Sequence, residues 1–220
     1  MNRYVTEFVG TFFLVFTIGL AVLGGTPMAP LAIGASLMVM VYMGGHVSGA
    51  HYNPAVSLAL TLRGSLAASE LAPYIGFQLL GAVVASLAVY VITGNTFVPA
   101  PGPTSSTLAA LLVEILYTTA LATVVLNVAT APAVAGNSFY GLAIGFTVAA
   151  AAFAGGPISG GAYNPAVGLG PAIVHALLGG GSIAHTWLYV VGPCIGGVIA
   201  ASIFRIQHGA TPEKAARKAA

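Results

Sequence analysis

The chain contains the stretch GGHVSGAHYNPAVSL at residues 44–58 and a second version of it, GGPISGGAYNPAVGL, at residues 155–169. Ten of the fifteen aligned positions are identical at an offset of 111 residues. In both copies an Asn-Pro-Ala triplet opens a short apolar segment. Proline suits the first turn of a helix, because its missing N–H would have no partner there. Each copy therefore predicts a loop that ends where a short helix begins.

Composition places this repeat in a membrane. Of the 220 residues, 58% are hydrophobic and only 5% are charged, and the mean hydropathy is +0.97. A soluble domain carries about 25% charged residues, so this chain cannot cover itself with a surface that faces water. Its apolar runs also lack the alternation of polar and apolar residues that is typical of membrane barrels. We therefore expect an all-α membrane protein.

Six apolar segments are long enough to cross a bilayer, which requires about 20 helical residues. Two further segments, 54–62 and 165–177, are too short to cross, and each begins at a proline. We therefore expect these two to be half-helices that re-enter the membrane from opposite faces. The six spans are expected at about residues 4–24, 30–46, 71–92, 107–130, 138–155 and 185–206.

The two halves of the chain are related beyond the Asn-Pro-Ala triplets. Glu7 in the first span and Glu114 in the fourth match at an offset of 107 residues. Because each half holds three spans, the second half enters the membrane from the opposite side, which makes an inverted repeat. We expect a single membrane domain over residues 1–220, with repeats at about 1–92 and 107–207 and a flexible cytoplasmic tail at 208–220.

The basic residues orient the chain in the membrane. All of them fall on one side of the expected topology, together with both termini, and the connections on the other side have none. By the positive-inside rule this side is cytoplasmic. We expect a multi-pass protein of the cell (inner) membrane. The basic residues are Arg3, Arg63, Arg205, Lys214, Arg217 and Lys218.

The two half-helices are expected to meet near the middle of the membrane with their N-termini facing. A helix N-terminus carries unpaired N–H groups and a partial positive charge, so two facing ends repel cations. Asn53 and Asn164 can cap these ends and still offer an amide donor to an occupant of a pore. Irregular backbone at this depth is tolerated where it lines a water-filled path. The candidate pore-lining loop residues are Gly49, Ala50, His51, Tyr52, Gly160 and Ala162.

At these residues the sequence resembles the aquaporin (major intrinsic protein) family. The resemblance covers about residues 3–207 and includes EFVGT at 7–11, GHVSGAHYNPAV at 45–56 and Gly192-Pro193. It implies an aquaporin-like fold, a passive channel with a pore in every subunit, and a homotetramer. It also implies that Glu7 and Glu114 are structural acids that accept backbone N–H bonds from the re-entrant loop of their own half. The motif residues of the pore are then Asn53, Pro54, Ala55, Asn164, Pro165 and Ala166.

The sequence departs from this family at the outer constriction of the pore. Most members have arginine directly after the second triplet, where this chain has Val167. The family pattern places the other constriction residues at Ile33, Ala152 and Gly161, so no aromatic residue, histidine or arginine is present. We expect a wider and more apolar pore that passes water and small uncharged solutes, namely ammonia, hydrogen peroxide, urea and, as the largest, glycerol.

A strict water channel is the alternative. Glycerol channels usually have an aspartate after the arginine and a basic residue four positions later, where this chain has Gly168 and Ala172. This local pattern is closer to that of the water channels. The constriction residues favour a broad pore and the residues after the second triplet favour a water channel, so the sequence leaves both functions open.

Other functions have weaker support in the sequence. A secondary transporter needs coupling groups within the membrane, and only the two intramembrane glutamates are available. A membrane-junction protein that conducts little is a third candidate. An enzyme has no nucleophile–base pair or metal-ligand spacing behind it, and nucleic-acid binding has no basic patch with aromatic residues. We expect no catalysis, cofactor or metal; the expected partners are water, small neutral solutes, membrane lipid and other copies of the chain.

Overall fold

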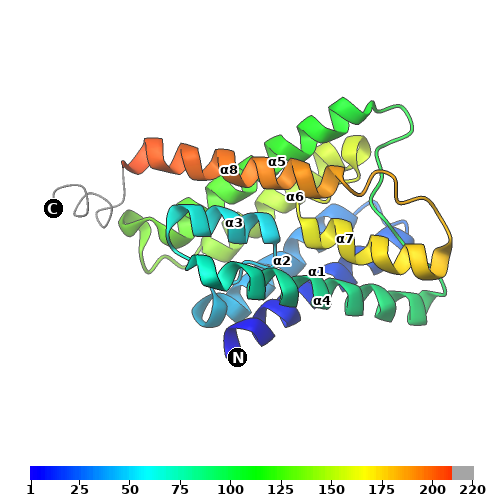
Figure 1. Cartoon of the computed structure of the whole chain (residues 1–220), viewed down its shortest axis with the longest axis horizontal. Coiled ribbons are helices and arrows are strands. Elements are labelled where there is room, and N and C mark those ends of the chain that lie inside the picture. The colour runs from blue at the N-terminus through cyan, green and yellow to red at the C-terminus, as the bar shows by residue number, and fades with distance from the viewer. Residues whose placement is uncertain (210–220) are drawn as a thin grey trace.

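The computed structural model describes residues 1–209, which are helical and contain no strand (Figure 1). Six of the helices are long and apolar enough to cross a membrane. They are α1 (Asn2–Leu23), α2 (Ala29–Ser48), α4 (Ala68–Thr93), α5 (Thr107–Thr130), α6 (Tyr140–Ser159) and α8 (Leu188–His208). The half-length helices are α3 (Pro54–Arg63) and α7 (Pro165–Val174), with a π-helical turn η2 (His175–Gly179) after α7 and a 3-10 turn η1 (Pro132–Val134) before α6. The six spans and two half-helices of the sequence analysis are thereby confirmed.

Two helices, α6 and α8, extend beyond the bounds expected from the sequence. The sequence predicts an end near residue 155 for the fifth span, but α6 continues through Pro157 to Ser159. Proline inside a helix removes one hydrogen bond, which membrane helices tolerate. The last carbonyls of a helix lack intrahelical donors, and one of them, Ile158 O, accepts from Gly102 N at 3.0 Å. The expected tail at 208–220 begins with His208, which ends α8, and residues 210–220 lie outside the described residues.

The helix packing repeats between the two halves of the chain. α1 packs against α2 and α4, as α5 packs against α6 and α8. The half-helices are exchanged, because α3 packs against α8 and α7 packs against α4. In Figure 1, α3 and α7 lie end to end across the middle of the molecule, with the N-terminus and the last turn of α8 at the same end. The architecture is an inverted repeat of three spans and one half-helix.

Two glycines allow α2 and α6 to cross in direct contact. A Cβ added to Gly34 would lie 2.5 Å from Gly145 O, and one added to Gly145 would lie 2.5 Å from Gly34 O. Lipid supplies no hydrophobic force between membrane helices, so these helices associate through close packing. Small residues at the contact permit this close packing. The two glycines are 111 residues apart, like the Asn-Pro-Ala triplets, so the crossing lies between equivalent positions of the two repeats.

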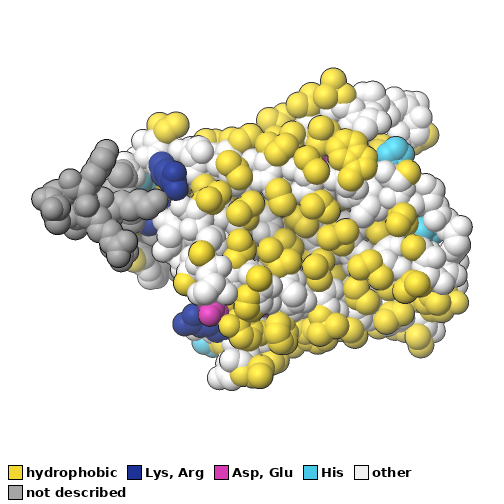
Figure 2. All heavy atoms as spheres, in the orientation of Figure 1, with side chains coloured by type: hydrophobic (Ala, Val, Ile, Leu, Met, Phe, Trp, Pro, Cys, Tyr) yellow, Lys and Arg dark blue, Asp and Glu magenta, His cyan; other side chains and the backbone are white. Residues whose placement is uncertain are grey.

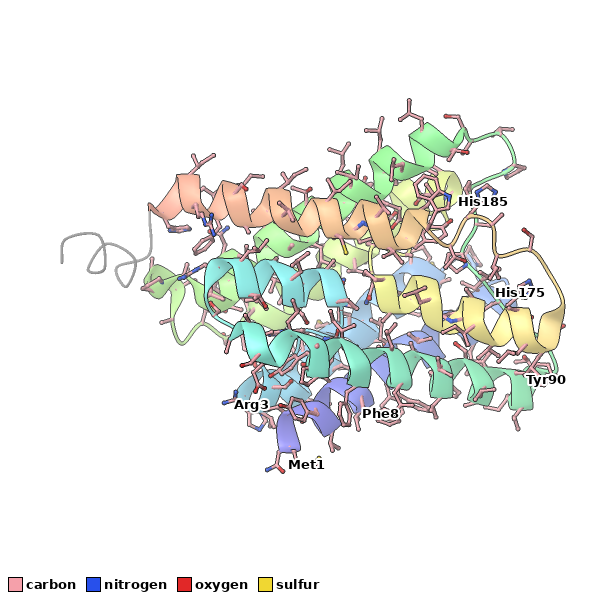
Figure 3. The ribbon with its side chains drawn as sticks, in the orientation of Figure 1. Met1, Arg3, Phe8, Tyr90, His175 and His185 are labelled. Atoms are coloured by element: carbon pink, nitrogen blue, oxygen red, sulfur yellow. The ribbon has the colours of Figure 1, made fainter. Side chains whose placement is uncertain are left out.

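The outer surface is suited to lipid. On the face shown in Figure 2, hydrophobic side chains spread over the middle of the molecule, and Lys and Arg side chains lie at the end with the N-terminus. Leu80, Val91 and Leu116 are each at least half exposed. Figure 3 places Arg3 at the end opposite to His175 and His185. Since water disfavours such an apolar belt, the chain is an integral multi-pass membrane protein.

The crossing generates a prediction. Gly145→Ala should destabilise the protein by about 1–3 kcal/mol, because the new methyl group overlaps backbone that cannot move away. Gly156→Ala is the matched control on the same helix, since a Cβ at Gly156 meets nothing within 4 Å. The stability of both variants is measured by heating the protein in detergent and determining the midpoint temperature, at which half of it is no longer monodisperse. Equal midpoints for the two variants would contradict a close crossing at this position.

Candidate pore

Each half-helix begins at an asparagine that caps it. Asn53 Oδ1 accepts hydrogen bonds from Ala55 N at 2.9 Å and Val56 N at 3.4 Å. Asn164 Oδ1 accepts one from Ala166 N at 2.9 Å. These bonds satisfy N–H groups that a helix start leaves without partners. The side-chain oxygens therefore face the helices, and the amide nitrogens face away from them.

The amide nitrogen of each asparagine binds the opposite half of the chain. Asn53 Nδ2 donates to Tyr163 O at 2.9 Å, and Asn164 Nδ2 donates to Tyr52 O at 2.8 Å. This exchange joins the two half-helices at their N-termini. A primary amide carries two hydrogens, so each asparagine retains one donor for an occupant of the space between the helices.

The tyrosines that accept these bonds have an unusual backbone. Tyr52 and Tyr163 both have φ of +49°, a left-handed conformation that non-glycine residues adopt rarely and at a cost in free energy. Their hydroxyls anchor the turns, because Tyr52 Oη donates to Met40 O at 3.0 Å and Tyr163 Oη donates to Ala151 O at 2.9 Å. The side chains thus hold the conformation that directs each carbonyl to the opposite asparagine.

Glu7 supports the first re-entrant loop from α1. Its Oε1 accepts from Ser48 Oγ at 2.7 Å and from His51 N at 3.0 Å. Its Oε2 accepts from Tyr52 N at 2.7 Å and from Gln78 Nε2 at 2.8 Å. Unpaired backbone N–H groups away from water cost free energy, and Glu7, which is fully buried, supplies acceptors for two of them.

Glu114 supports the second loop in the same way from α5. Its Oε1 accepts from Ser159 Oγ at 2.8 Å and from Ala162 N at 3.1 Å, and its Oε2 accepts from Tyr163 N at 2.7 Å. The equivalence of the two acids therefore extends from the sequence to their hydrogen bonds. The first half differs only in its additional donor from Gln78.

A narrow cavity passes between the two asparagines. The volume that water centres can occupy in it is about 30 Å³. Ile33, Gly161 and Val167, which are three of the four expected constriction residues, line this cavity, and Ala152 does not. Among the expected loop residues, the lining includes Ala50, His51, Tyr52 and Ala162 but not Gly49 or Gly160. Pro54, Ala55, Pro165 and Ala166 lie behind the asparagines in the first turns of the half-helices and do not line the cavity.

The apolar wall of this cavity was not predicted from the sequence. The wall comes from four spans and the half-helix α3, and its residues recur in the two halves at the offsets of 107 and 111 that relate the glutamates and the motifs. Applying these offsets to the spans would have paired the wall residues, although not shown that they face a pore. The missed residues are Leu14, Ile18, Leu37, Val56, Leu121, Val125, Ile144 and Val148.

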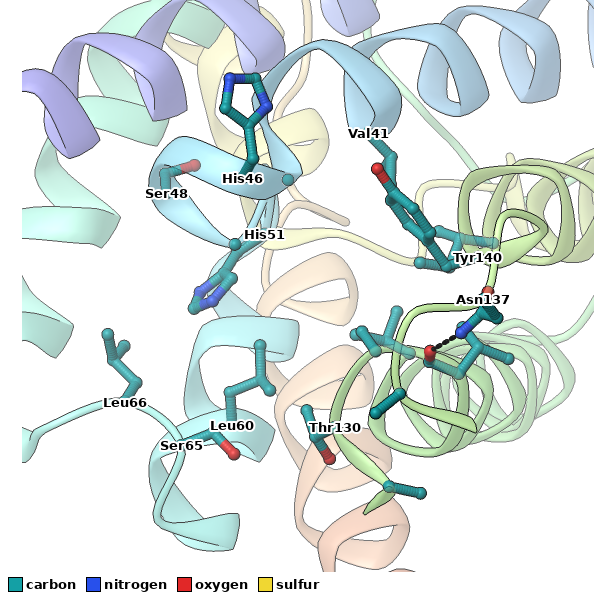
Figure 4. A pocket seen from close by; sticks show the side chains of 18 of the residues that line it. Val41, His46, Ser48, His51, Leu60, Ser65, Leu66, Thr130, Asn137 and Tyr140 are labelled. Carbon is teal, nitrogen blue, oxygen red and sulfur yellow. Dashed lines mark hydrogen bonds between the residues drawn. The ribbon is translucent and has the colours of Figure 1, made fainter. Parts of the chain in front are cut away.

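A wider cavity of about 600 Å³, shown in Figure 4, opens at the end near the N-terminus, because Arg3 is part of its lining. Its lining includes Arg3, His46, Gly49 and Tyr140. The loop before α6 forms one side, held by Asn137 Nδ2, which donates to two backbone carbonyls at 2.7 and 2.8 Å. The molecule therefore has a wide vestibule that leads to a narrow middle.

Comparison with known families agrees with this geometry. The family model described as Major intrinsic protein matches residues 1–204. The chain belongs to the major intrinsic protein family.

Known relatives of this family member include plant and bacterial channels. Aquaporin NIP1-1 of Zea mays is 37% identical over 216 residues, which cover 94% of this chain and 74% of the relative. Glycerol uptake facilitator protein-like 6 of Lactiplantibacillus plantarum is 36% identical over 221 residues, which cover 94% of this chain and 98% of the relative. The X-ray structure of the aquaglyceroporin from Plasmodium falciparum shares the fold, with a TM-score of 0.84 at 24% identity over 92% of this chain and 94% of that one. The protein is thus a channel for water and small solutes.

The buried acids generate a prediction. Glu114→Gln should destabilise the protein by about 1–3 kcal/mol, because the amide NH₂ group replaces an acceptor and opposes a buried donor. Glu70→Gln is the control, since Glu70 accepts one bond, from Tyr4 Oη at 3.0 Å, which a glutamine oxygen can also accept. Thermal unfolding in detergent measures both variants. A Glu114→Gln protein as stable as Glu70→Gln would show that the acid is not needed to hold the loop.

Proposed function

We propose that the chain is a passive channel with a broad, apolar outer constriction, which passes water at a moderate rate together with ammonia, hydrogen peroxide, urea and glycerol. The observation that carries this proposal is Val167, which lines the narrow cavity beside Ile33 and Gly161. Arginine at this position would provide fixed donors and a positive charge. Valine provides neither, and Gly161 adds no side chain to the lining. An apolar ring holds water less well, because a passing molecule loses hydrogen bonds that it cannot replace.

We propose further that the facing half-helices exclude ions. Two positive helix ends lie at the asparagines, joined through Asn53 and Asn164. Half-helix dipoles of this kind form electrostatic barriers to protons and cations in channels of the aquaporin type. Because the remaining amide hydrogens are donors, a passing water molecule would have to accept hydrogen bonds there, which interrupts a chain of water molecules along which protons could move.

A strict water channel is the second candidate. The observation in its favour is the small size of the middle cavity, in which water centres can occupy about 30 Å³, against about 600 Å³ in the vestibule. The residue types at Gly168 and Ala172 also favour a strict water channel, because they are closer to the pattern of the water channels. The two candidates differ in one measurable property, which is the ratio of solute flux to water flux.

The orientation and assembly belong to this proposal. Arg3, Arg63 and Arg205 support cytoplasmic termini by the positive-inside rule, and membership of the family supports a homotetramer. Lipid would then cover the apolar faces that do not contact other subunits.

A C-terminal tag should be labelled in cells only after permeabilisation, and the protein mass of the detergent complex should correspond to four chains. Labelling of intact cells, or the mass of one chain, would contradict these assignments.

The substrate range generates a prediction for Val167→Arg. The guanidinium group should narrow the outer constriction, so that glycerol and urea flux falls by more than water flux does. Val167→Leu is the matched control, because it adds bulk without donors or charge. Stopped-flow light scattering of proteoliposomes, first in an impermeant osmolyte and then in each solute, gives both fluxes for the three proteins.

A wild-type protein that passes only water would support the strict water channel instead. Equal ratios of solute to water flux in wild type and Val167→Arg would show that residue 167 does not determine the substrate range. If Val167→Leu lowers the ratio as far as Val167→Arg does, bulk alone explains the effect and the argument from charge and donors fails.

A further inference from the structure

The lining of the narrow cavity follows the inverted repeat completely. Its eighteen residues form nine pairs, each related by the offset of 107 or 111 residues. Ile33 pairs with Ile144, and Val56 pairs with Val167. With valine in both half-helices, the two ends of this cavity present nearly the same apolar surface.

One pair breaks this symmetry in chemistry as well as in size. His51 of the first loop corresponds to Ala162 of the second. The remaining pairs are identical or differ only by small aliphatic groups, as Ile18 and Val125 do. An imidazole therefore occupies one end of the cavity where the other end has a methyl group. The end with His51 is the more obstructed and the more polar of the two.

His51 lies where the narrow cavity meets the vestibule. Three residues line both cavities, namely His51, Val125 and Ile144. They are buried, with exposures of 8%, 5% and 4%. The volume open to water centres falls from about 600 Å³ to about 30 Å³ across them. These three residues form a neck at the end of the narrow cavity that faces the vestibule, and Figure 4 shows the ring of His51 among the residues of the vestibule.

The hydrogen bonds around His51 favour the tautomer with the proton on Nε2. Gln78 Nε2 lies 2.8 Å from Glu7 Oε2 and 3.0 Å from Ser57 Oγ, and donates to both. The hydroxyl hydrogen of Ser57 is then available for His51 Nδ1, which is 3.0 Å away. A neutral imidazole that accepts at Nδ1 carries its hydrogen on Nε2. The neck therefore contains one side-chain donor on an otherwise apolar ring.

We propose that this neck of His51, Val125 and Ile144 selects among solutes in this channel, in place of an outer ring that has lost its arginine. The inference rests on the proposed broad outer constriction and identifies the step that then limits passage. A solute has to present an acceptor atom to His51 Nε2 while its other side passes Val125 and Ile144. Water, ammonia, urea and glycerol each have such an acceptor, and the size of the aliphatic side chains sets the largest solute admitted.

The repeat supplies a matched pair of variants. Ile144→Ala enlarges the inner neck, and Ile33→Ala makes the same change at the equivalent outer position. In proteoliposomes, Ile144→Ala should raise the ratio of glycerol to water flux on the order of tenfold, the discrimination that a small change in an apolar site can produce. Ile33→Ala should leave this ratio near the wild-type value. Ile144→Val and Ile33→Val provide the same comparison with a smaller change if either alanine variant does not fold.

A second readout tests the histidine. His51→Ala should raise the ratio like Ile144→Ala, while Ser57→Ala, which keeps the ring but removes its hydrogen-bond partner, should change it less. The neck is refuted if the Ile33 variants raise the ratio as much as the Ile144 variants do. A wild type that passes only water contradicts the broad outer constriction but not the neck, which still predicts that urea flux appears first in the Ile144 variants.

Discussion

The structure depends on giving hydrogen-bond partners to irregular backbone in the middle of a membrane. Water is scarce at this depth, and each unpaired N–H or C=O group costs free energy. Glu7 and Glu114 supply acceptors for the N–H groups of the two loops. Asn53 and Asn164 supply donors for the carbonyls of the opposite loop. These few side chains allow two half-helices to begin in the middle of the molecule, where Asn53 and Asn164 line the narrow cavity.

The same arrangement connects fold and function. Because each asparagine uses one amide hydrogen to hold the opposite loop, the position of the remaining donor is fixed by the fold and not by the solute. The left-handed turns at Tyr52 and Tyr163 direct the carbonyls to this exchange. Their strain is offset by the tyrosine hydroxyls, which bind backbone in α2 and α6. These bonds hold the lining of the narrow cavity in place.

The sequence was sufficient for the architecture because hydrophobic length and proline position are local signals. It predicted the six spans, the half-helices at Pro54 and Pro165 and the inverted repeat. It did not predict the continuation of α6 beyond residue 155, because the partner of that helix end comes from Gly102 in a distant loop. This loop, residues 94–106, is rich in proline, glycine and serine, which is typical of a linker. Yet Phe97 in it is buried, and Thr96 Oγ1 lies 2.8 Å from His175 Nδ1.

The pore wall was less predictable than the motifs. An apolar span has no polar face that indicates which side lines a pore, so Ile144 and Val148 could not be distinguished from residues that face lipid. Ala152, expected from the family pattern, does not line the narrow cavity, whereas Val148 one turn earlier does. Side chains whose bonds follow from a motif, such as the two asparagines, lie where the pattern indicates. Those whose role depends on the rotation of a helix required coordinates.

We propose that the facing half-helix ends admit water and exclude protons, and paired measurements on one preparation of wild-type proteoliposomes test both properties together. Osmotic shrinkage should be faster than in empty liposomes and should increase with the amount of protein. Relaxation of a pH gradient, followed by an internal fluorescent indicator with the membrane potential clamped, should match that of empty liposomes. Proton flux that rises with protein content in step with water flux would contradict the claim.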